Sequence, residues 1–396
     1  MFHNSRLLPL FFVWILSACQ TGLPAMPTYA PLPTSPDSVV TTLPALASYK
    51  VVAYYPSWAA KSRSVTPGDL PAELLTQINY AFILPTETGE CQPDDSAAAD
   101  GNFPALRLLR REHPGLKLYI SIAGYGYDRP YQAIVQSPEM IAKFVSSCVG
   151  FMKINGFDGI DLDWEYPKPA QKGAFTALLT EFRNQLDALG LENGRRLGLT
   201  IAAPAGSQVR SYDLPAIAPL LDGINLMAYD YYGTWIPVTG FNAPLFVPRD
   251  DPQKLSVDVS VQVYLSAGVP PEKLILGIPF YGRGWADVSP ANDGLFQPYG
   301  GPAQGALAKG TFDYRELREK YIDVYPRHWE EMAQAAWLYD PVSRTMISYD
   351  DPQIVGLKAT YARQHGLGGV MIWQIAGDDP DFSLLNAIQK ELPGNK

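Results

Sequence analysis

The sequence predicts an α/β protein, a (β/α)8 TIM barrel with a small α+β insertion between the seventh strand and the seventh helix. Three observations lead to this prediction. Short β-rich runs alternate with longer helical patterns from Lys50 onward, eight such units fit into one chain, and one interval of about seventy residues interrupts the seventh unit. Strand–helix alternation indicates parallel strands covered by helices, and eight units favour a closed barrel. A doubly wound open sheet is the structural alternative.

The predicted strands are short runs rich in β-branched and aromatic residues, and each is followed by a helical or turn-rich stretch. Their carboxyl ends matter most, because those ends form the catalytic face of a barrel. We expect strands over residues 50–55, 77–82, 116–122, 157–163, 196–202, 223–229, 273–280 and 368–373. The clearest helical patterns cover residues 138–154, 172–189, 255–267 and 352–365.

The long interval after the seventh strand has structure of its own. It contains a helical pattern at 314–321 and strand-like runs at 335–339 and 345–349. Connections in a barrel are usually 2–6 residues long, so this interval predicts an inserted domain, which we place over residues 286–350. An insertion after a barrel strand would form a wall of the site.

Composition places the chain among folded proteins with a large core. Of 396 residues, 47% are hydrophobic and only 18% are charged, which excludes disorder over most of the chain. The formal net charge of -9 argues against a nucleic acid partner. Aromatic residues are abundant (23 Tyr, 8 Trp, 16 Phe), which suits the flat faces of sugars as well as a core. We expect a monomer.

The amino terminus has the pattern of an export signal. One positive residue, Arg6, precedes an apolar run at 7–16 that is too short to span a bilayer. The small pair Ser17-Ala18 before Cys19 is similar to the bacterial lipobox, in which the Cys becomes the lipidated first residue. We therefore expect a lipoprotein signal peptide over residues 1–18 and a lipid anchor at the outer membrane or the bacterial cell surface. An ordinary signal peptide is the alternative.

Residues 19–48 are expected to form a tether, because they are rich in Pro, Thr and Ser and carry a single charge, Asp37. The folded domain is expected over residues 49–396. Within it, Cys148 lies in an apolar helical pattern and is expected to be a small buried residue, whereas Cys91 lies in a polar stretch. A disulfide between them is allowed in an exported protein, and the sequence leaves this open.

The segment at 157–167, Phe-Asp-Gly-Ile-Asp-Leu-Asp-Trp-Glu-Tyr-Pro, carries the strongest chemical signal. Alternate residues of a strand share a face, so Asp161, Asp163 and Glu165 should project together into the barrel mouth. Burial and mutual repulsion should hold a proton on this group near neutral pH, most usefully on the outermost carboxyl, Glu165. A general acid beside anionic carboxylates is what glycoside hydrolysis needs. A solvated acidic strand end and a Mg²⁺ or Ca²⁺ site are the alternatives.

Residues 158–165 resemble the DxxDxDxE signature of glycoside hydrolase family 18, the chitinase family. The insertion is similar to the chitinase insertion domain of that family. The resemblance implies a TIM barrel, hydrolysis of β-1,4 linkages in chitin or N-acetylglucosamine oligosaccharides, and no cofactor or metal ion. Further motifs in the family's order are Tyr54-Tyr55-Pro56-Ser57-Trp58, Asn79-Tyr80-Ala81-Phe82, Ser121-Ile122-Ala123-Gly124-Tyr125, Met227-Ala228-Tyr229-Asp230, Pro279-Phe280-Tyr281-Gly282-Arg283 and Met371-Ile372-Trp373.

The resemblance also implies a role for each matching residue. Glu165 would protonate the glycosidic oxygen, while the 2-acetamido carbonyl of the substrate attacks the anomeric carbon and forms an oxazolinium ion. Asp163 would orient the acetamido group and balance its charge, with Asp161 sharing a proton behind it. Tyr229 would hydrogen-bond the acetamido oxygen, and Trp373 would be the floor beneath the sugar. The other expected substrate-binding residues are Tyr54, Trp58, Phe82, Tyr125, Met227, Asp230, Trp235, Tyr281 and Arg283, with Trp285 as a further loop aromatic.

Two departures from the family pattern affect the subsites. Ala123-Gly124-Tyr125 stands where the family usually has two glycines and often Trp, and Tyr231-Tyr232 replaces the common Phe-His. The second change bears on specificity on the leaving-group side. An endo-β-N-acetylglucosaminidase acting on glycoprotein glycans is one alternative function, and a non-catalytic, lectin-like chitin-binding protein is another.

Overall fold

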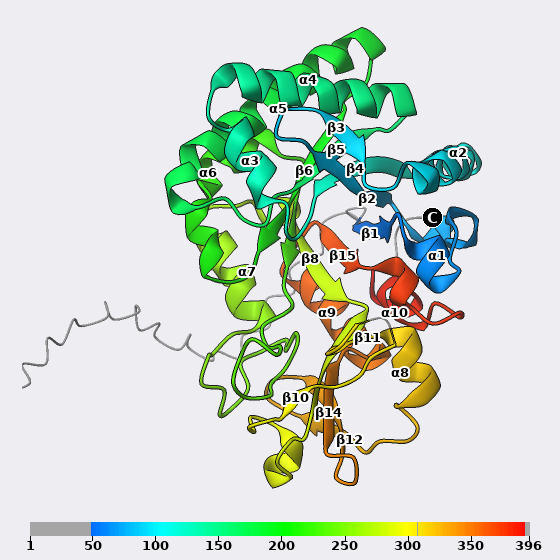
Figure 1. Cartoon of the computed structure of the whole chain (residues 1–396), viewed down its shortest axis with the longest axis vertical. Coiled ribbons are helices and arrows are strands. Elements are labelled where there is room, and N and C mark those ends of the chain that lie inside the picture. Colours follow the sequence, from blue (N-terminus) through cyan, green and yellow to red (C-terminus); the bar gives the residue numbers. More distant parts are fainter. Residues whose placement is uncertain (1–48, 307, 393–396) are drawn as a thin grey trace, which may run out of the picture. The chain divides into compact units, whose positions relative to one another are not determined.

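The computed structural model describes residues 49–306 and 308–392, which form a closed parallel barrel surrounded by helices, with a second sheet at one side (Figure 1). Residues 1–48, with the predicted signal peptide, the tether and Cys19, lie outside the described residues. The predicted TIM barrel is confirmed, and the doubly wound alternative is wrong. The eight barrel strands are β1 (Lys50–Pro56), β2 (Gln77–Pro85), β4 (Lys117–Ala123), β5 (Gly159–Asp163), β6 (Gly198–Pro204), β7 (Gly223–Met227), β8 (Leu274–Pro279) and β15 (Gly369–Trp373).

The order of the strands fixes which of them face each other. They run β1-β15-β8-β7-β6-β5-β4-β2, and the pairing of β1 with β2 closes the ring. In this ring β5 and β15 are four strands apart, so they lie on opposite sides of the barrel. Each strand ends at the same mouth because all eight are parallel.

The four helices with the clearest sequence patterns form where they were predicted. They are α4 (Pro138–Asn155), α5 (Lys172–Asn193), α7 (Val257–Ser266) and α9 (Pro352–Gln364). Side chains of Ser137, Ser256 and Asp351 accept hydrogen bonds from backbone N–H groups of the first turns of α4, α7 and α9, which fixes where these helices begin. In the described part of the chain, no helix is long and apolar enough to cross a membrane. The remaining helices are α1 (Ala59–Arg63), α2 (Ser96–Glu112), α3 (Asp128–Ile134), α6 (Leu214–Ile217), α8 (Tyr314–Lys320) and α10 (Ser383–Glu391).

The insertion is an antiparallel sheet with one short helix, placed between β8 and α9 as predicted (lower part of Figure 1). Its first strand begins at Tyr281, before the predicted boundary at residue 286, because the chain pairs with β11 and β14 directly after leaving the barrel. Trp285 lies in this strand and is fully buried. The expectation that Trp285 is a loop aromatic at a flanking subsite is therefore wrong. The strands are β9 (Tyr281–Ala286), β10 (Gly301–Pro302), β11 (Thr311–Asp313), β12 (Arg327–Glu330), β13 (Ala335–Asp340) and β14 (Thr345–Tyr349).

Cys91 and Cys148 form a disulfide, the possibility that the sequence left open. The bond joins β3 (Cys91–Pro93), which pairs with the end of β2, to the buried face of α4. The two cysteines are 57 residues apart in the sequence. In the loop-closure model a cross-link of that span stabilises a fold by roughly 4 kcal/mol.

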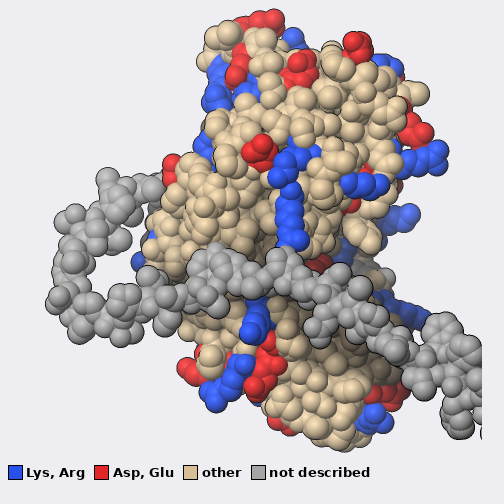
Figure 2. Space-filling view, turned by 90° about the vertical axis from the view of Figure 1, so that its left-hand side faces the viewer, with Lys and Arg blue, Asp and Glu red and all other residues tan. Residues whose placement is uncertain are grey.

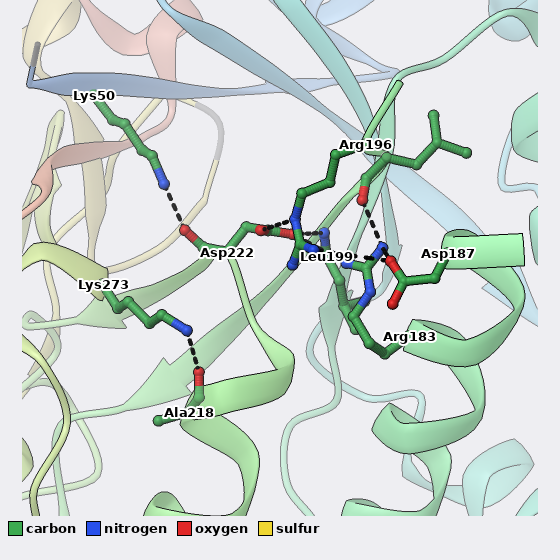
Figure 3. A network of polar contacts seen from close by, with 9 residues as sticks. Lys50, Arg183, Asp187, Arg196, Leu199, Ala218, Asp222 and Lys273 are labelled. Atoms are coloured by element: carbon green, nitrogen blue, oxygen red, sulfur yellow. Dashed lines mark hydrogen bonds and ion pairs between the residues drawn. The ribbon is translucent and has the colours of Figure 1, made fainter. Parts of the chain in front are cut away.

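Charged side chains also hold the barrel at the end opposite its mouth. Asp222, just before β7, accepts hydrogen bonds from Arg183 at 3.1 Å, Arg196 at 2.8 Å and the backbone N–H of Leu199 at 2.9 Å (Figure 3). Lys50 at the start of β1 donates to the carbonyl oxygen of Asp222. This network joins the amino-terminal ends of β1, β6 and β7, so its role is structural. On the face drawn in Figure 2, charged side chains of both signs lie among a majority of uncharged residues.

Candidate active site

A cleft of ≈ 900 Å³ lies at the carboxyl ends of the barrel strands. Each of the eight strands, or the loop that follows it, contributes to its lining, and so does the insertion. All the residues predicted from the sequence to bind substrate line this cleft except Trp285, and Asp161 lies beneath it. The predicted residues that line it are Tyr54, Trp58, Phe82, Tyr125, Asp163, Glu165, Met227, Tyr229, Asp230, Trp235, Tyr281, Arg283 and Trp373.

Asp161 is fully buried and its carboxyl group is surrounded by donors. It accepts hydrogen bonds from Tyr54 Oη at 2.6 Å, Ser121 Oγ at 2.8 Å, Thr200 Oγ1 at 2.6 Å and Asn225 Nδ2 at 3.0 Å. Burial raises the pKa of Asp161, and the four hydrogen bonds oppose that shift because they favour the ionised form. A carboxyl group with four donors is suited to remain a carboxylate.

Three of these donors were not predicted from the sequence. Ser121 and Thr200 stand directly beside Asp161 on the neighbouring strands β4 and β6. Asn225 comes from β7, one strand further along the ring. A polar residue at an inward position of an otherwise apolar strand could have indicated each donor. Which of these residues meet around Asp161, however, depends on the register between the strands.

Asp163 is also buried, but its surroundings differ from those of Asp161. Its Oδ1 has no hydrogen-bond partner among the described residues. Burial raises the pKa of Asp163 well above its usual range, and the nearby carboxyl groups of Glu165 and Asp161 raise it further. We infer that Asp163 holds a proton more readily than Asp161 does.

Glu165 follows β5 and lies at the surface of the cleft. Burial raises the pKa of Glu165 to about 7, a hydrogen bond with Tyr166 opposes that shift, and the charge of Asp230 adds to it. The carboxyl group therefore holds a proton up to neutral pH. Such a group can act as a general acid under ordinary conditions.

Trp373 ends β15 and faces Glu165 from the opposite side of the barrel mouth. Its ring stacks with Phe82, with centroids 5.8 Å apart, and contacts the edge of Tyr54 at 5.5 Å. Phe82 in turn lies 6.2 Å from Trp58. These four rings make a continuous aromatic surface of the kind that binds the flat faces of sugars.

Asp230 connects the barrel side of the cleft to the insertion. Its carboxylate accepts two hydrogen bonds from Arg283 and one from Tyr281, each 2.8 Å long. The Arg283 guanidinium also lies 5.2 Å from the ring centroid of Trp235. Trp235 is 56% exposed, and Tyr125 is 85% exposed, so both offer free ring faces at the cleft.

Tyr231 and Tyr232, the pair that departs from the family pattern, are both buried. The Tyr231 hydroxyl group lies 2.6 Å from Ser260 Oγ and donates to the carbonyl oxygen of Ser256 at 2.9 Å, while that of Tyr232 donates to Asp251. Both hydroxyl groups therefore hold the loop after β7 in place.

Other residues of the cleft were not anticipated from the sequence. Tyr166 directly follows Glu165 and Gln374 directly follows Trp373, so adjacency to a predicted site residue was the only sequence feature that could have indicated them. Arg63 and Asp313 also line the cleft, although neither belongs to a predicted motif. In the described ranges, no three or more His, Cys, Asp and Glu side chains are grouped so that they could hold a metal ion.

A protonated carboxyl group facing an aromatic floor across the mouth of a parallel barrel defines a barrel enzyme that cleaves glycosidic bonds. Comparison with known families identifies the group more closely. Residues 50–378 match the family described as Glycosyl hydrolases family 18. The chain belongs to this family, and it is a glycoside hydrolase.

Individual relatives agree in sequence and in structure. The chain is 34% identical to Chitinase A1 of Niallia circulans over 417 residues, covering 89% of this chain and 60% of that protein. It is 31% identical to Chitinase B of Serratia marcescens over 389 residues, covering 83% of this chain and 77% of that protein. Its structure is similar to that of chitinase ChiA74 from Bacillus thuringiensis, with a TM-score of 0.83 and 30% identity over 87% of this chain and 70% of that one.

Proposed function

We propose that the protein hydrolyses β-1,4 linkages in chitin and N-acetylglucosamine oligosaccharides by a substrate-assisted, retaining mechanism. The observation that carries this proposal is the pair of carboxyl groups at the end of β5. Glu165 holds a proton in the cleft, and beside it Asp163 is buried with an unpartnered oxygen. The names of the relatives, which are chitinases, support the choice of polymer.

The mechanism begins with a sugar seated on Trp373 and the glycosidic oxygen directed toward Glu165. Glu165 gives its proton to that oxygen, the acetamido carbonyl oxygen attacks the anomeric carbon, and the bond to the leaving sugar breaks. As the oxazolinium charge develops, Asp163 leaves its proton with Asp161, which shares it, and the Asp163 carboxylate balances the positive charge. Water, activated by the Glu165 carboxylate, then attacks the same carbon from the other side. Two inversions give overall retention.

Tyr229 is suited to bind the acetamido oxygen. Its ring is held against Tyr281, with centroids 6.1 Å apart. Its hydroxyl group contacts Met371 Sδ at 4.0 Å, and a thioether is a weak acceptor. The hydroxyl hydrogen is therefore available to a stronger acceptor such as an amide carbonyl.

Catalysis is favoured over binding alone because Glu165, Asp163 and Tyr229 all line one cleft. An endo-β-N-acetylglucosaminidase would use the same acid and the same oxazolinium ion. The inserted sheet adds Arg283, Thr311 and Asp313 to the cleft wall, and a deep cleft fits a linear polymer.

The test of this function is dependence on the acetamido group. The N-acetylglucosamine hexasaccharide should be cleaved and should release the β-anomer first, as followed by NMR before mutarotation. Cellohexaose and fully deacetylated chitosan should be cleaved negligibly, because neither carries the internal nucleophile. Efficient cleavage of cellohexaose, or an α-anomer as the first product, would refute the mechanism.

We propose in addition that the protein is exported and anchored in the bacterial cell envelope through a lipid on Cys19. The wild type should then partition into the detergent phase of membrane extracts, whereas Cys19→Ala should be released or retain its signal. The Pro-rich tether of some thirty residues would reach up to roughly 90 Å from the membrane if fully extended as polyproline II. A wild-type protein found wholly soluble would contradict the anchor.

A further inference from the structure

An ion pair within the cleft joins two segments that are distant in the sequence. Arg63, the last residue of α1, donates to Asp313, the last residue of β11, from Nε to Oδ2 at 2.5 Å and from Nη2 to Oδ1 at 3.1 Å. The two side chains are 10% and 11% exposed, and both residues line the cleft. Two parallel hydrogen bonds between a guanidinium and a carboxylate give a strong and well-oriented contact.

The barrel order shows where this ion pair lies. α1 follows β1, and β11 belongs to the insertion that follows β8, while β15 lies between β1 and β8 in the ring. The Arg63–Asp313 pair therefore spans the carboxyl end of β15, the strand that ends in Trp373. The backbone N–H of Tyr314, next to Asp313, donates to the carbonyl oxygen of Phe280 at 2.9 Å and fixes this position.

A second arginine, Arg315, connects the loops that follow β1, β8 and β15. Arg315 donates from Nη1 to the carbonyl oxygen of Arg63 at 2.9 Å and from Nε to that of Asp378 at 3.3 Å. Asp378 is buried in the loop that follows β15. The loops after β1, β8 and β15 thus form one connected structure beyond Trp373, on the side away from Glu165.

The chemistry of the β-1,4 linkage determines which end of a bound sugar chain lies on this side of the cleft. In the proposed function, the sugar on Trp373 supplies the anomeric carbon, and the sugar whose oxygen Glu165 protonates is the leaving group. In a β-1,4 chain, the units beyond the sugar on Trp373 therefore lead to the non-reducing end. A chain bound in this direction would place that end toward the Arg63–Asp313 pair, which lines this side of the cleft.

We propose that the Arg63–Asp313 ion pair closes the cleft on the non-reducing side and sets how many sugar units bind between it and the scissile bond. This inference rests on the proposed function and deepens it. A longer chain would have to separate two nearly buried charges that are already paired, and separating such charges is costly. The enzyme would then release fragments of one short length from the non-reducing end.

The test uses N-acetylglucosamine pentamer and hexamer labelled at the reducing end, with initial products resolved by mass spectrometry. The wild type should release unlabelled fragments of the same length from both substrates. In Arg63→Ala/Asp313→Ala, the ratio of longer to shorter unlabelled fragments should rise by roughly tenfold, the usual effect of opening a pocket by a small group. The charge-reversed variant Arg63→Asp/Asp313→Arg should restore much of the wild-type pattern.

The matched control is Arg318→Ala/Asp323→Ala, which removes an exposed ion pair of the same insertion outside the cleft and should leave the pattern unchanged. If the double variant in the cleft does not fold, Asp313→Asn, which keeps the side-chain shape, must still shift the pattern toward longer fragments. Two results would refute the closed cleft end but leave the proposed function standing. One is wild-type fragments whose length changes with the substrate, and the other is a folded and active variant with an unchanged pattern. A wild type that cleaves neither oligomer would overturn the proposed function itself.

Discussion

Glu165→Gln is expected to lower the turnover of N-acetylglucosamine oligosaccharides by about 10²-fold or more while leaving their binding intact. The amide keeps the size of the side chain and most of its hydrogen bonding, but it has no proton to give to the glycosidic oxygen. Turnover is measured on unactivated oligosaccharides, whose leaving group needs that proton, and binding is measured by calorimetry.

The pH dependence of wild-type activity should report the ionisation of Glu165. The acid must be protonated, so kcat/KM should fall as the pH rises through about 7, the pKa to which burial raises Glu165. This fall should be absent from the residual activity of Glu165→Gln. Glu112→Gln changes an exposed carboxylate at the end of α2 and is the matched control, with wild-type turnover expected. Near-normal turnover by Glu165→Gln would remove Glu165 from the role of acid.

The barrel could be predicted from the sequence because its signals are local. Each strand is a short apolar run, and the alternation in residues 157–167 places three carboxyl groups on one face without knowledge of any other strand. For the same reason, the strand-end residues predicted for the cleft all line it. Strand ends of a parallel barrel meet at one mouth whatever the details of packing.

The contacts that could not be predicted join residues that are distant in the sequence. Trp285 is two residues after the predicted site residue Arg283, yet it is buried because β9 pairs with β14, about sixty residues later. Arg63 and Asp313 are 250 residues apart, and no local pattern links them. The different environments of Asp161 and Asp163 also depend on neighbouring strands, because the four donors to Asp161 come from β1, β4, β6 and β7.

That difference between the two aspartates leads to the second large effect. Asp163→Asn is expected to lower turnover by about 10²-fold without a large change in the thermal midpoint. Burial and the neighbouring carboxyl groups raise the pKa of Asp163 well above its usual range, which favours the neutral form of the resting side chain. An amide of the same shape therefore replaces it at little cost in folding.

Asp161→Asn is the informative comparison, because the carboxyl group of Asp161 accepts four hydrogen bonds. Asparagine replaces one of the two acceptor oxygens with an NH2 group, which cannot accept from the donors that face it, so a loss of stability of roughly 1–3 kcal/mol is expected. If both variants lost stability equally, the assignment of the proton to Asp163 would be wrong.

The loss of turnover in Asp163→Asn has an electrostatic cause. As the oxazolinium ion forms, a positive charge appears next to Asp163, and a side chain that can release its proton becomes the matching anion. Asparagine stays neutral, so the intermediate is formed without a balancing charge even though Glu165 still supplies its proton. The pH profile of kcat/KM should also change shape, because Asp163 and Glu165 no longer titrate as a pair and one ionisation remains. An unchanged rate together with an unchanged pH profile would leave Asp163 with a structural role. Asp161 would then be the carboxylate that balances the oxazolinium charge.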